Sequence, residues 1–247
     1  MSFDSLIKPK WCPGCGNFGI LAAAKNVLSS LNLRPENVVV VSGIGCSGKI
    51  SHFIGCYGFE GLHGRVLPVA SGVKLANHGL TVLGFAGDGD AYGIGLGHFI
   101  HSCRRNIDLT YVVHNNEVYA LTTGQYSPTS PKGSVTKSSP FGSLEVPVNP
   151  VALALSAGCS FVARCFALDV KHLEKVLVEA VRFKGFALVD VLQPCVVWKK
   201  GGVQFFKKRI YDLQELLNAM KKWKLCFMQP QTFFFCLPIM SPAALTS

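Results

Sequence analysis

Apolar runs typical of buried β-strands alternate with segments of helical spacing along most of this chain. The strand-like runs occupy residues 37–43, 81–86, 109–113, 160–164 and 185–191, and most of their positions are apolar. Strands that are covered on both faces, as in parallel sheets, have this continuous apolar character. The pattern therefore predicts an α/β fold built on a parallel sheet.

Segments in which apolar residues recur three or four positions apart lie between these runs, as expected for amphipathic helices. The predicted helices cover residues 18–31, 66–77, 92–103, 150–157 and 169–183. Asp169 is the expected cap of the last of them. A strand–helix–strand unit thus spans residues 81–113, and in open α/β sheets ligands bind outside the carboxyl ends of the strands.

Polar motifs follow both strands of that unit. GDGD at residues 87–90 follows the first strand, and HNNEV at residues 114–118 follows the second. Gly-Asp-Gly alone is common in ordinary turns. Its position after a strand, and the 28 residues that separate its Asp from the second Asn of the pair, favour a ligand site instead.

The chemistry of these motifs suits a diphosphate held through a divalent cation. Mg²⁺ takes oxygen ligands from carboxylates, neutral carbonyls and phosphates. We expect Asp88 to supply a carboxylate oxygen, Asn116 an amide oxygen and Val118 a backbone carbonyl oxygen. Gly87 and Gly89 allow the main chain to approach phosphate groups closely.

Two cysteine motifs precede this unit. WCPGCG at residues 11–16 contains a CxxC pair, which can bind zinc, bind an iron–sulfur cluster, form a redox disulfide or serve no special purpose. IGCSGK at residues 44–49 follows the strand at 37–43, so Cys46 is expected at the same sheet edge as Asp88. Alternatively, Cys46 is a small residue of the apolar core. A lone histidine such as His63 is more often structural than catalytic.

A long segment poor in regular pattern, residues 119–150, follows the Asn pair. Loops of this length are usually functional or disordered. We expect its first half, LTTGQYSPT, to be functional because it leaves the predicted metal site directly. Its Ser-, Pro- and Lys-rich remainder is equally compatible with an exposed connection.

Composition narrows the class of protein. With 247 residues, 49% hydrophobic and 15% charged, the chain can bury a substantial core and is not a disordered protein. It has no apolar run of about 18 residues and no visible secretory signal, so a cytoplasmic protein with reduced or metal-bound cysteines is expected. Of the net charge of +10, +6 lies in residues 199–247, which favours acidic partners such as nucleic acid or an electron carrier.

Four motifs read together carry a family resemblance: WCPGCG, SGIGCSGK, GDGDAYGIGLGH with HNNEVY, and LQPC. In this order and spacing they resemble the β subunit of 2-oxoacid:ferredoxin oxidoreductases over about residues 8–198. The resemblance implies a parallel-sheet thiamine-diphosphate-binding fold with helices on both faces. It also implies thiamine diphosphate, Mg²⁺ and one 4Fe–4S cluster as cofactors.

The activity implied by the resemblance is the coenzyme A-dependent oxidative decarboxylation of a 2-oxoacid to acyl-CoA and CO₂, with reduction of ferredoxin. The implied partners are an α, or fused γ–α, subunit and ferredoxin, without a membrane or nucleic acid. The alternatives are a thiamine-dependent decarboxylase or synthase without ferredoxin chemistry, an inactive truncated relative and, last, a zinc-bearing nucleic-acid binder.

The resemblance also assigns residues. It places the cluster ligands at Cys12, Cys15, Cys46 and Cys195, and the Mg²⁺ ligands at Asp88, Asn116 and Val118. It implies that Lys49 contacts the carboxylate of the substrate. The alternative is that Lys49 is a solvated surface lysine. Contacts to the diphosphate and thiazolium are implied at Ile44, Gly45, Cys46, Ser47, His63, Gly89, Asp90, Ala120 and Leu121. Residues 1–198 would form the cofactor domain, and residues 199–247 a divergent or truncated tail.

Overall fold

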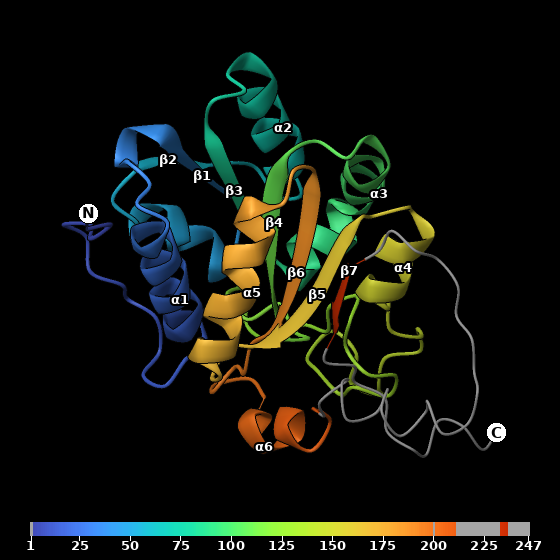
Figure 1. The fold of residues 1–247 in the computed structure, drawn as a ribbon. Helices are drawn as coiled ribbons and strands as arrows, with labels where there is room; N and C mark the ends of the chain where they lie inside the picture. The colour runs from blue at the N-terminus through green and yellow to red at the C-terminus, as the bar shows by residue number, and fades with distance from the viewer. Residues whose placement is uncertain (1, 200, 211–232, 237–247) are drawn as a thin grey trace, which may run out of the picture.

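The fold is centred on a seven-stranded, wholly parallel β-sheet with the strand order β2-β1-β3-β4-β6-β5-β7 (Figure 1). The structure is a computed structural model that describes residues 2–199, 201–210 and 233–236. The strands are β1 (Val38–Ser42), β2 (Tyr57–Glu60), β3 (Thr81–Gly87), β4 (Leu109–Asn115), β5 (Phe161–Phe166), β6 (Phe186–Leu192) and β7 (Phe233–Cys236).

Helices cover both faces of this sheet (Figure 1). One layer contains α1 (Asn17–Ser30) and α5 (Val170–Arg182), and the other contains α2 (Val66–Ala76), α3 (Leu96–Arg105) and α4 (Pro150–Ser156). Helix α6 (Gly202–Lys207) lies beyond the carboxyl ends of the strands. Shorter turns are η1 (Pro35–Asn37), η2 (Ser47–His52) and the π-helical turn η3 (Asp90–Ile94).

The side chains of each strand divide between two apolar cores, one under each helical layer. In β1, Val38 and Val40 join the core beneath α1 and α5, whereas Val39 and Val41 join the core beneath α2 and α3. Successive residues of a strand point to opposite faces, so a strand covered on both sides is expected to be apolar at most of its positions. This explains the continuous apolar runs in the sequence and confirms the α/β fold with helices on both faces.

Each predicted strand and helix is present, with ends that shift by a few residues. Two features differ from the prediction. Strand β2 was not predicted, because it is an edge strand whose four residues are all exposed and therefore show no apolar pattern. The helix predicted from residue 92 is preceded by η3, so the chain leaves β3 through a π-helical turn before α3 begins.

The C-terminal region is described in part. Phe206 of α6 is buried and packs with Phe166 and Leu192 at the ends of β5 and β6, which attaches α6 to the sheet. The rest of the predicted tail lies largely outside the described residues, and its division from the cofactor domain at residue 198 stays a prediction. Among the described residues, no helix combines the length and hydrophobicity that crossing a membrane requires.

Candidate functional site

A cavity of about 310 Å³ opens at the carboxyl ends of β1, β3 and β4. Every residue predicted to contact Mg²⁺ or thiamine diphosphate lines it, although these residues come from four separate segments of the chain. They are Ile44, Gly45, Cys46, Ser47, His63, Asp88, Gly89, Asp90, Asn116, Val118, Ala120 and Leu121. Since parallel strands end at one edge, the fold alone gathers the segments that follow them.

Asp88 lies directly after β3 and is buried against the wall of this cavity. Two hydroxyls donate to its Oδ2 atom, Ser127 Oγ at 2.5 Å and Thr129 Oγ1 at 2.6 Å. Burial raises the pKa of Asp88 to about 6, despite these hydrogen bonds, which act in the opposite direction. A cation in the cavity would favour the charged form and offset this penalty.

Asn116 and Val118 form a tight polar turn after β4. The Val118 N–H donates to Asn116 Oδ1 at 3.0 Å, and Asn116 Nδ2 donates to Gln193 Oε1 at 3.1 Å. Glu117 between them has a positive φ of 57°, so the backbone reverses at this residue. A carboxylate, an amide oxygen and a backbone carbonyl thus border one cavity, which is a donor set that fits Mg²⁺.

His63 and Asp90 form a pair on the cavity wall. His63 Nδ1 lies 2.5 Å from Asp90 Oδ1, and the Gly64 N–H donates to the same oxygen at 2.6 Å. Asp90 Oδ2 is buried and has no hydrogen-bond partner among the described residues. Burial raises the pKa of Asp90, with His63 and Gly64 opposing the shift. The pair fixes the ring of His63 at the place where the resemblance predicts a cofactor contact.

Two glycines have steric reasons for their positions. Gly45 has a φ of +101°, a conformation that side chains rarely adopt, and its surroundings are open. At Gly89 a Cβ atom would lie 2.1 Å from the ring of Tyr119, whose hydroxyl donates to the Gly89 carbonyl oxygen at 3.0 Å. Gly89 therefore admits an aromatic ring, in addition to the close approach to phosphates that we expected there.

A second cavity, of about 180 Å³, lies beside the first and is lined by Cys12, Cys15, Cys46 and Cys195. Hydrogen bonds join the segments that carry these thiols. Trp11 Nε1 donates to the Cys46 carbonyl oxygen at 2.7 Å, and Gln193 Nε2 donates to Cys15 Sγ at 3.4 Å. Four cysteines from three distant parts of the sequence therefore converge at one place.

The four thiols line a cavity. Within the described residues, no three Cys, His, Asp or Glu side chains are gathered closely enough to hold a single metal ion. Cys12 and Cys15 are not joined in a disulfide. A cluster in which each thiolate ligates a different iron needs more widely spaced sulfurs than zinc does.

Burial works against the thiolate form of two of these cysteines, Cys15 and Cys46. Burial raises the pKa of Cys15 to about 11, and the neighbouring cysteines add to the shift. Burial likewise raises the pKa of Cys46, while the nearby Lys49 acts in the opposite direction. Ligation requires thiolates, so metal binding at this cavity must release protons.

Lys49 lines the cysteine cavity and not the cavity that contains Asp88. The two cavities share a wall made by Cys46, Asn116, Ala120, Leu121 and Gln193. Lys49 therefore lies near the predicted cofactor but across that wall, and its contact with a substrate carboxylate stays a prediction. Of the cysteines not assigned to the cluster, Cys103, Cys159 and Cys165 are buried, as expected for core residues.

Sequence reasoning missed several residues of this site. Ser127 and Thr129 bond to Asp88 from the long loop, and Gln193 separates the two cavities. His114 also lines the first cavity; its Nδ1 atom lies 2.8 Å from Asn17 Oδ1, and burial lowers its pKa to about 3. The available signals were the loop, whose first half was expected to be functional, and the motifs HNNEVY and LQPC, which contain His114 and Gln193.

Comparison with known proteins gives a consistent result. The family model described as "Thiamine pyrophosphate enzyme, C-terminal TPP binding domain" matches residues 15–191. A 2-oxoacid:ferredoxin oxidoreductase subunit beta from Saccharolobus solfataricus is 53% identical over 208 residues, which are 83% of this chain and 68% of the relative. The 2-oxoglutarate oxidoreductase subunit KorB of Mycobacterium tuberculosis is 47% identical over 206 residues, 83% of this chain and 55% of that protein.

A solved structure is also similar. It is the 2-oxoglutarate:ferredoxin oxidoreductase from Magnetococcus marinus with 2-oxoglutarate, coenzyme A and succinyl-CoA bound. The TM-score is 0.82 at 37% sequence identity, and the match covers 84% of this chain and 72% of that chain.

Proposed function

Since the chain belongs to the family of 2-oxoacid:ferredoxin oxidoreductase β subunits, we propose that it oxidatively decarboxylates a 2-oxoacid together with an α, or fused γ–α, partner. The 2-oxoacid and coenzyme A become acyl-CoA and CO₂, a proton is released, and the two electrons reduce ferredoxin one at a time. The observation that carries this proposal is the wall shared by the Asp88 cavity and the four-cysteine cavity.

The Asp88 cavity is the proposed site of Mg²⁺ and thiamine diphosphate. Asp88, Asn116 and the Val118 carbonyl would hold the ion, and the loop after β1 together with His63 would contact the diphosphate. When bound, thiamine diphosphate supplies the electron-accepting chemistry that decarboxylation needs, while the protein orients it and controls the electrostatics. Tyr119, packed against Gly89, encloses the same cavity from the side of the long loop.

The four-cysteine cavity is the proposed site of one 4Fe–4S cluster. Cys12, Cys15, Cys46 and Cys195 would ligate it, because four thiolates are the usual ligand set. Cys46 lines both cavities, so it would bring the cluster next to the reacting cofactor. Electrons would then need to travel only across the shared wall before they leave for ferredoxin.

A direct test is co-expression with an α subunit, anaerobic reconstitution with iron and sulfide, and an assay of acyl-CoA formation. Pyruvate, 2-oxoglutarate and branched-chain 2-oxoacids should be compared, with ferredoxin as acceptor. We expect acyl-CoA formation, from at least one of them, that requires ferredoxin, thiamine diphosphate and Mg²⁺. Absence of acyl-CoA formation from every 2-oxoacid in a fully loaded complex would overturn the proposal.

Replacing the cysteines separates this proposal from a thiamine-dependent decarboxylase or synthase. A Cys195→Ser variant should lose ferredoxin reduction and iron together. If turnover survives in a variant that binds no iron, the cluster has no part in the reaction and the alternative is correct. Cys165→Ser, at a buried cysteine far along the sequence from the motif residues, is the matched control for the substitution itself.

A further inference from the structure

The long loop between β4 and α4 forms hydrogen bonds with the carboxylate of Asp88. Ser127 Oγ and Thr129 Oγ1 both donate to Oδ2 of Asp88, at 2.5 and 2.6 Å. The three residues are almost fully buried, with exposed fractions of 1% for Asp88, 2% for Ser127 and 6% for Thr129. Neither hydroxyl engages the other carboxylate oxygen, Oδ1. The loop therefore fixes the orientation in which Asp88 borders the cavity.

Thr129 is itself restrained by the last residue of β4. Its Oγ1 atom lies 3.1 Å from Asn115 Oδ1, besides its shorter contact with Asp88. A hydroxyl has one proton to donate, so two acceptors share it. The bond to the charged carboxylate is the stronger of the two. The amide oxygen of Asn115 therefore competes with Asp88 for this proton, while its contact with Oγ1 limits rotation of the threonine side chain.

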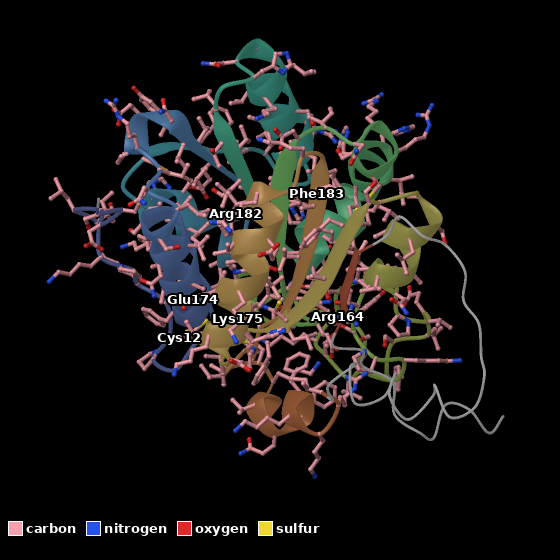
Figure 2. All side chains as sticks on the ribbon, in the orientation of Figure 1. Cys12, Arg164, Glu174, Lys175, Arg182 and Phe183 are labelled. Carbon is pink, nitrogen blue, oxygen red and sulfur yellow. The ribbon has the colours of Figure 1, made fainter. Side chains whose placement is uncertain are left out.

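Asn115 is in turn fixed by a buried ion pair inside the sheet. Its Nδ2 atom donates to Asp190 Oδ1 at 3.2 Å, and the same oxygen accepts from the Tyr92 hydroxyl at 2.9 Å. Arg164 Nε donates to the other oxygen of Asp190 at 2.7 Å. Asp190 is fully buried, and Arg164 lies toward the carboxyl end of β5, on the same side of the molecule as Cys12 (Figure 2).

A continuous chain of hydrogen bonds thus runs from the interior of the sheet to the cavity. Arg164, Asp190 and Asn115 lie on β5, β6 and β4, which are neighbouring strands, so their relative positions are set by the sheet ladder. Thr129 then connects this rigid group to Asp88. A side chain held in this way is pre-organised for one geometry, and Mg²⁺ demands near-ideal octahedral ligand placement.

We propose that Thr129 and Asn115 are positioning residues that hold Asp88 in the orientation required for Mg²⁺, and so set the magnesium affinity of the thiamine diphosphate site. The inference rests on the proposed function, because the magnesium site is part of it. Partners that orient metal ligands typically change metal affinity by about 10- to 100-fold when they are removed. Neither residue needs to touch the ion or the substrate.

The test compares Thr129→Val with the wild type in the complex with the α subunit. Valine keeps the shape of threonine but has no hydroxyl. At saturating thiamine diphosphate, cofactor binding is measured by calorimetry across a Mg²⁺ titration. We expect Thr129→Val to raise the Mg²⁺ concentration for half-maximal binding by about 10- to 100-fold. The turnover number at saturating Mg²⁺ should change much less, because the ion is then bound again.

Two matched variants complete the design. Thr129→Ser restores the hydroxyl and should return the Mg²⁺ requirement to within about threefold of the wild type, below the range expected for loss of the hydroxyl. Thr136→Val removes a hydroxyl of the same loop that hydrogen-bonds to Ser138 and Ser139 and not to Asp88, and should leave the requirement unchanged. If Thr129→Val fails to fold, as judged by circular dichroism, Ser127→Ala takes its place with the same expected direction.

The outcomes separate the inference from the function on which it rests. A wild-type complex that binds thiamine diphosphate without Mg²⁺, or not at all, overturns both. Magnesium-dependent binding in the wild type with an unchanged requirement in Thr129→Val overturns the positioning role alone. A Thr129→Ser variant as impaired as Thr129→Val also overturns it, because the hydroxyl would then not be the operative group.

Discussion

At the scale of single residues, the site contains ionisable groups whose burial works against their charged forms. Asp88 and Asp90 are both buried carboxylic acids with raised pKa values, and His114 is a buried imidazole with a lowered one. Such groups reduce the stability of a fold unless a ligand compensates them. They are therefore informative about what the cavity is built to bind.

Asp88→Asn should stabilise the metal-free chain and abolish magnesium-dependent cofactor binding. The folded-state pKa of Asp88 is about 6, raised from 3.8, so stability falls as pH rises between these values and the full penalty is present at neutral pH. Removing the charge should add about 3 kcal/mol to the free energy of unfolding. Urea unfolding measures it, with exposed Glu36→Gln as the control. A destabilised Asp88→Asn chain would contradict the account.

His114 should make the chain sensitive to acid. Burial lowers its pKa from 6.5 to about 3, so the folded state excludes a proton that the unfolded chain accepts. Stability is then lost as pH falls from 6.5 towards 3, by up to about 1.4 kcal/mol for each pH unit. His114→Gln should unfold with a shallower pH dependence in that window, whereas exposed His78→Gln should not. Equal slopes for both variants would rule out this role.

At the scale of elements, the turn that carries Asn116 and Val118 is tied to the segment around α6. Glu117 is partly buried and forms ion pairs with Lys199 and Arg209. Both cations also lie over the ring of Phe205, at 4.1 Å for Lys199 and 4.6 Å for Arg209. Helix α6 thus restrains the proposed magnesium turn from outside the cavity.

Lys199→Met should loosen this connection. Glu117 would keep only Arg209, at 3.4 Å, as a charged partner. We expect the free energy of unfolding to fall by about 1–3 kcal/mol, the range for a buried group that loses a charged hydrogen-bond partner. Lys207→Met, on the exposed side of α6, is the matched control. Urea unfolding that shows the same stability for both variants would mean that the ion pair does not hold the turn.

The sequence could predict those helices and strands whose buried positions produce a recognisable pattern of apolar residues. The four-valine run of β1 and the strand before Asp88 are apolar at most positions because helices cover both faces of the sheet. The edge strand β2 carries no such pattern. The return of the long loop to Asp88 through Ser127 depends on tertiary contacts, which local spacing does not encode.

The residues of the candidate site also differ in whether the sequence could predict them. Asp88, Asn116 and Val118 could be predicted from residues alone, since they end parallel strands that meet at one edge of the sheet. The convergence of Cys12 and Cys195 could not, because no local rule connects residues so far apart in sequence. It was expected only from the family resemblance, and the structure places both thiols on one cavity.

At the scale of the whole molecule, the proposed machinery is two adjoining cavities at one edge of a rigid sheet. Their shared wall contains Cys46 and Gln193, which contact both spaces. The proposed function includes an α subunit, and the similar proteins are named as β subunits. In the proposed assembly, this chain would hold the cofactor and the first electron acceptor side by side.

The most direct test is electron paramagnetic resonance of the anaerobically reconstituted complex, with roughly four irons per β chain. The complex is loaded with thiamine diphosphate and Mg²⁺, and a 2-oxoacid and coenzyme A are added without ferredoxin. The account predicts that the cluster signal of a reduced 4Fe–4S centre appears after substrate addition and is missing in Asp88→Asn. A loaded complex that forms acyl-CoA with ferredoxin while its cluster never becomes reduced would contradict it.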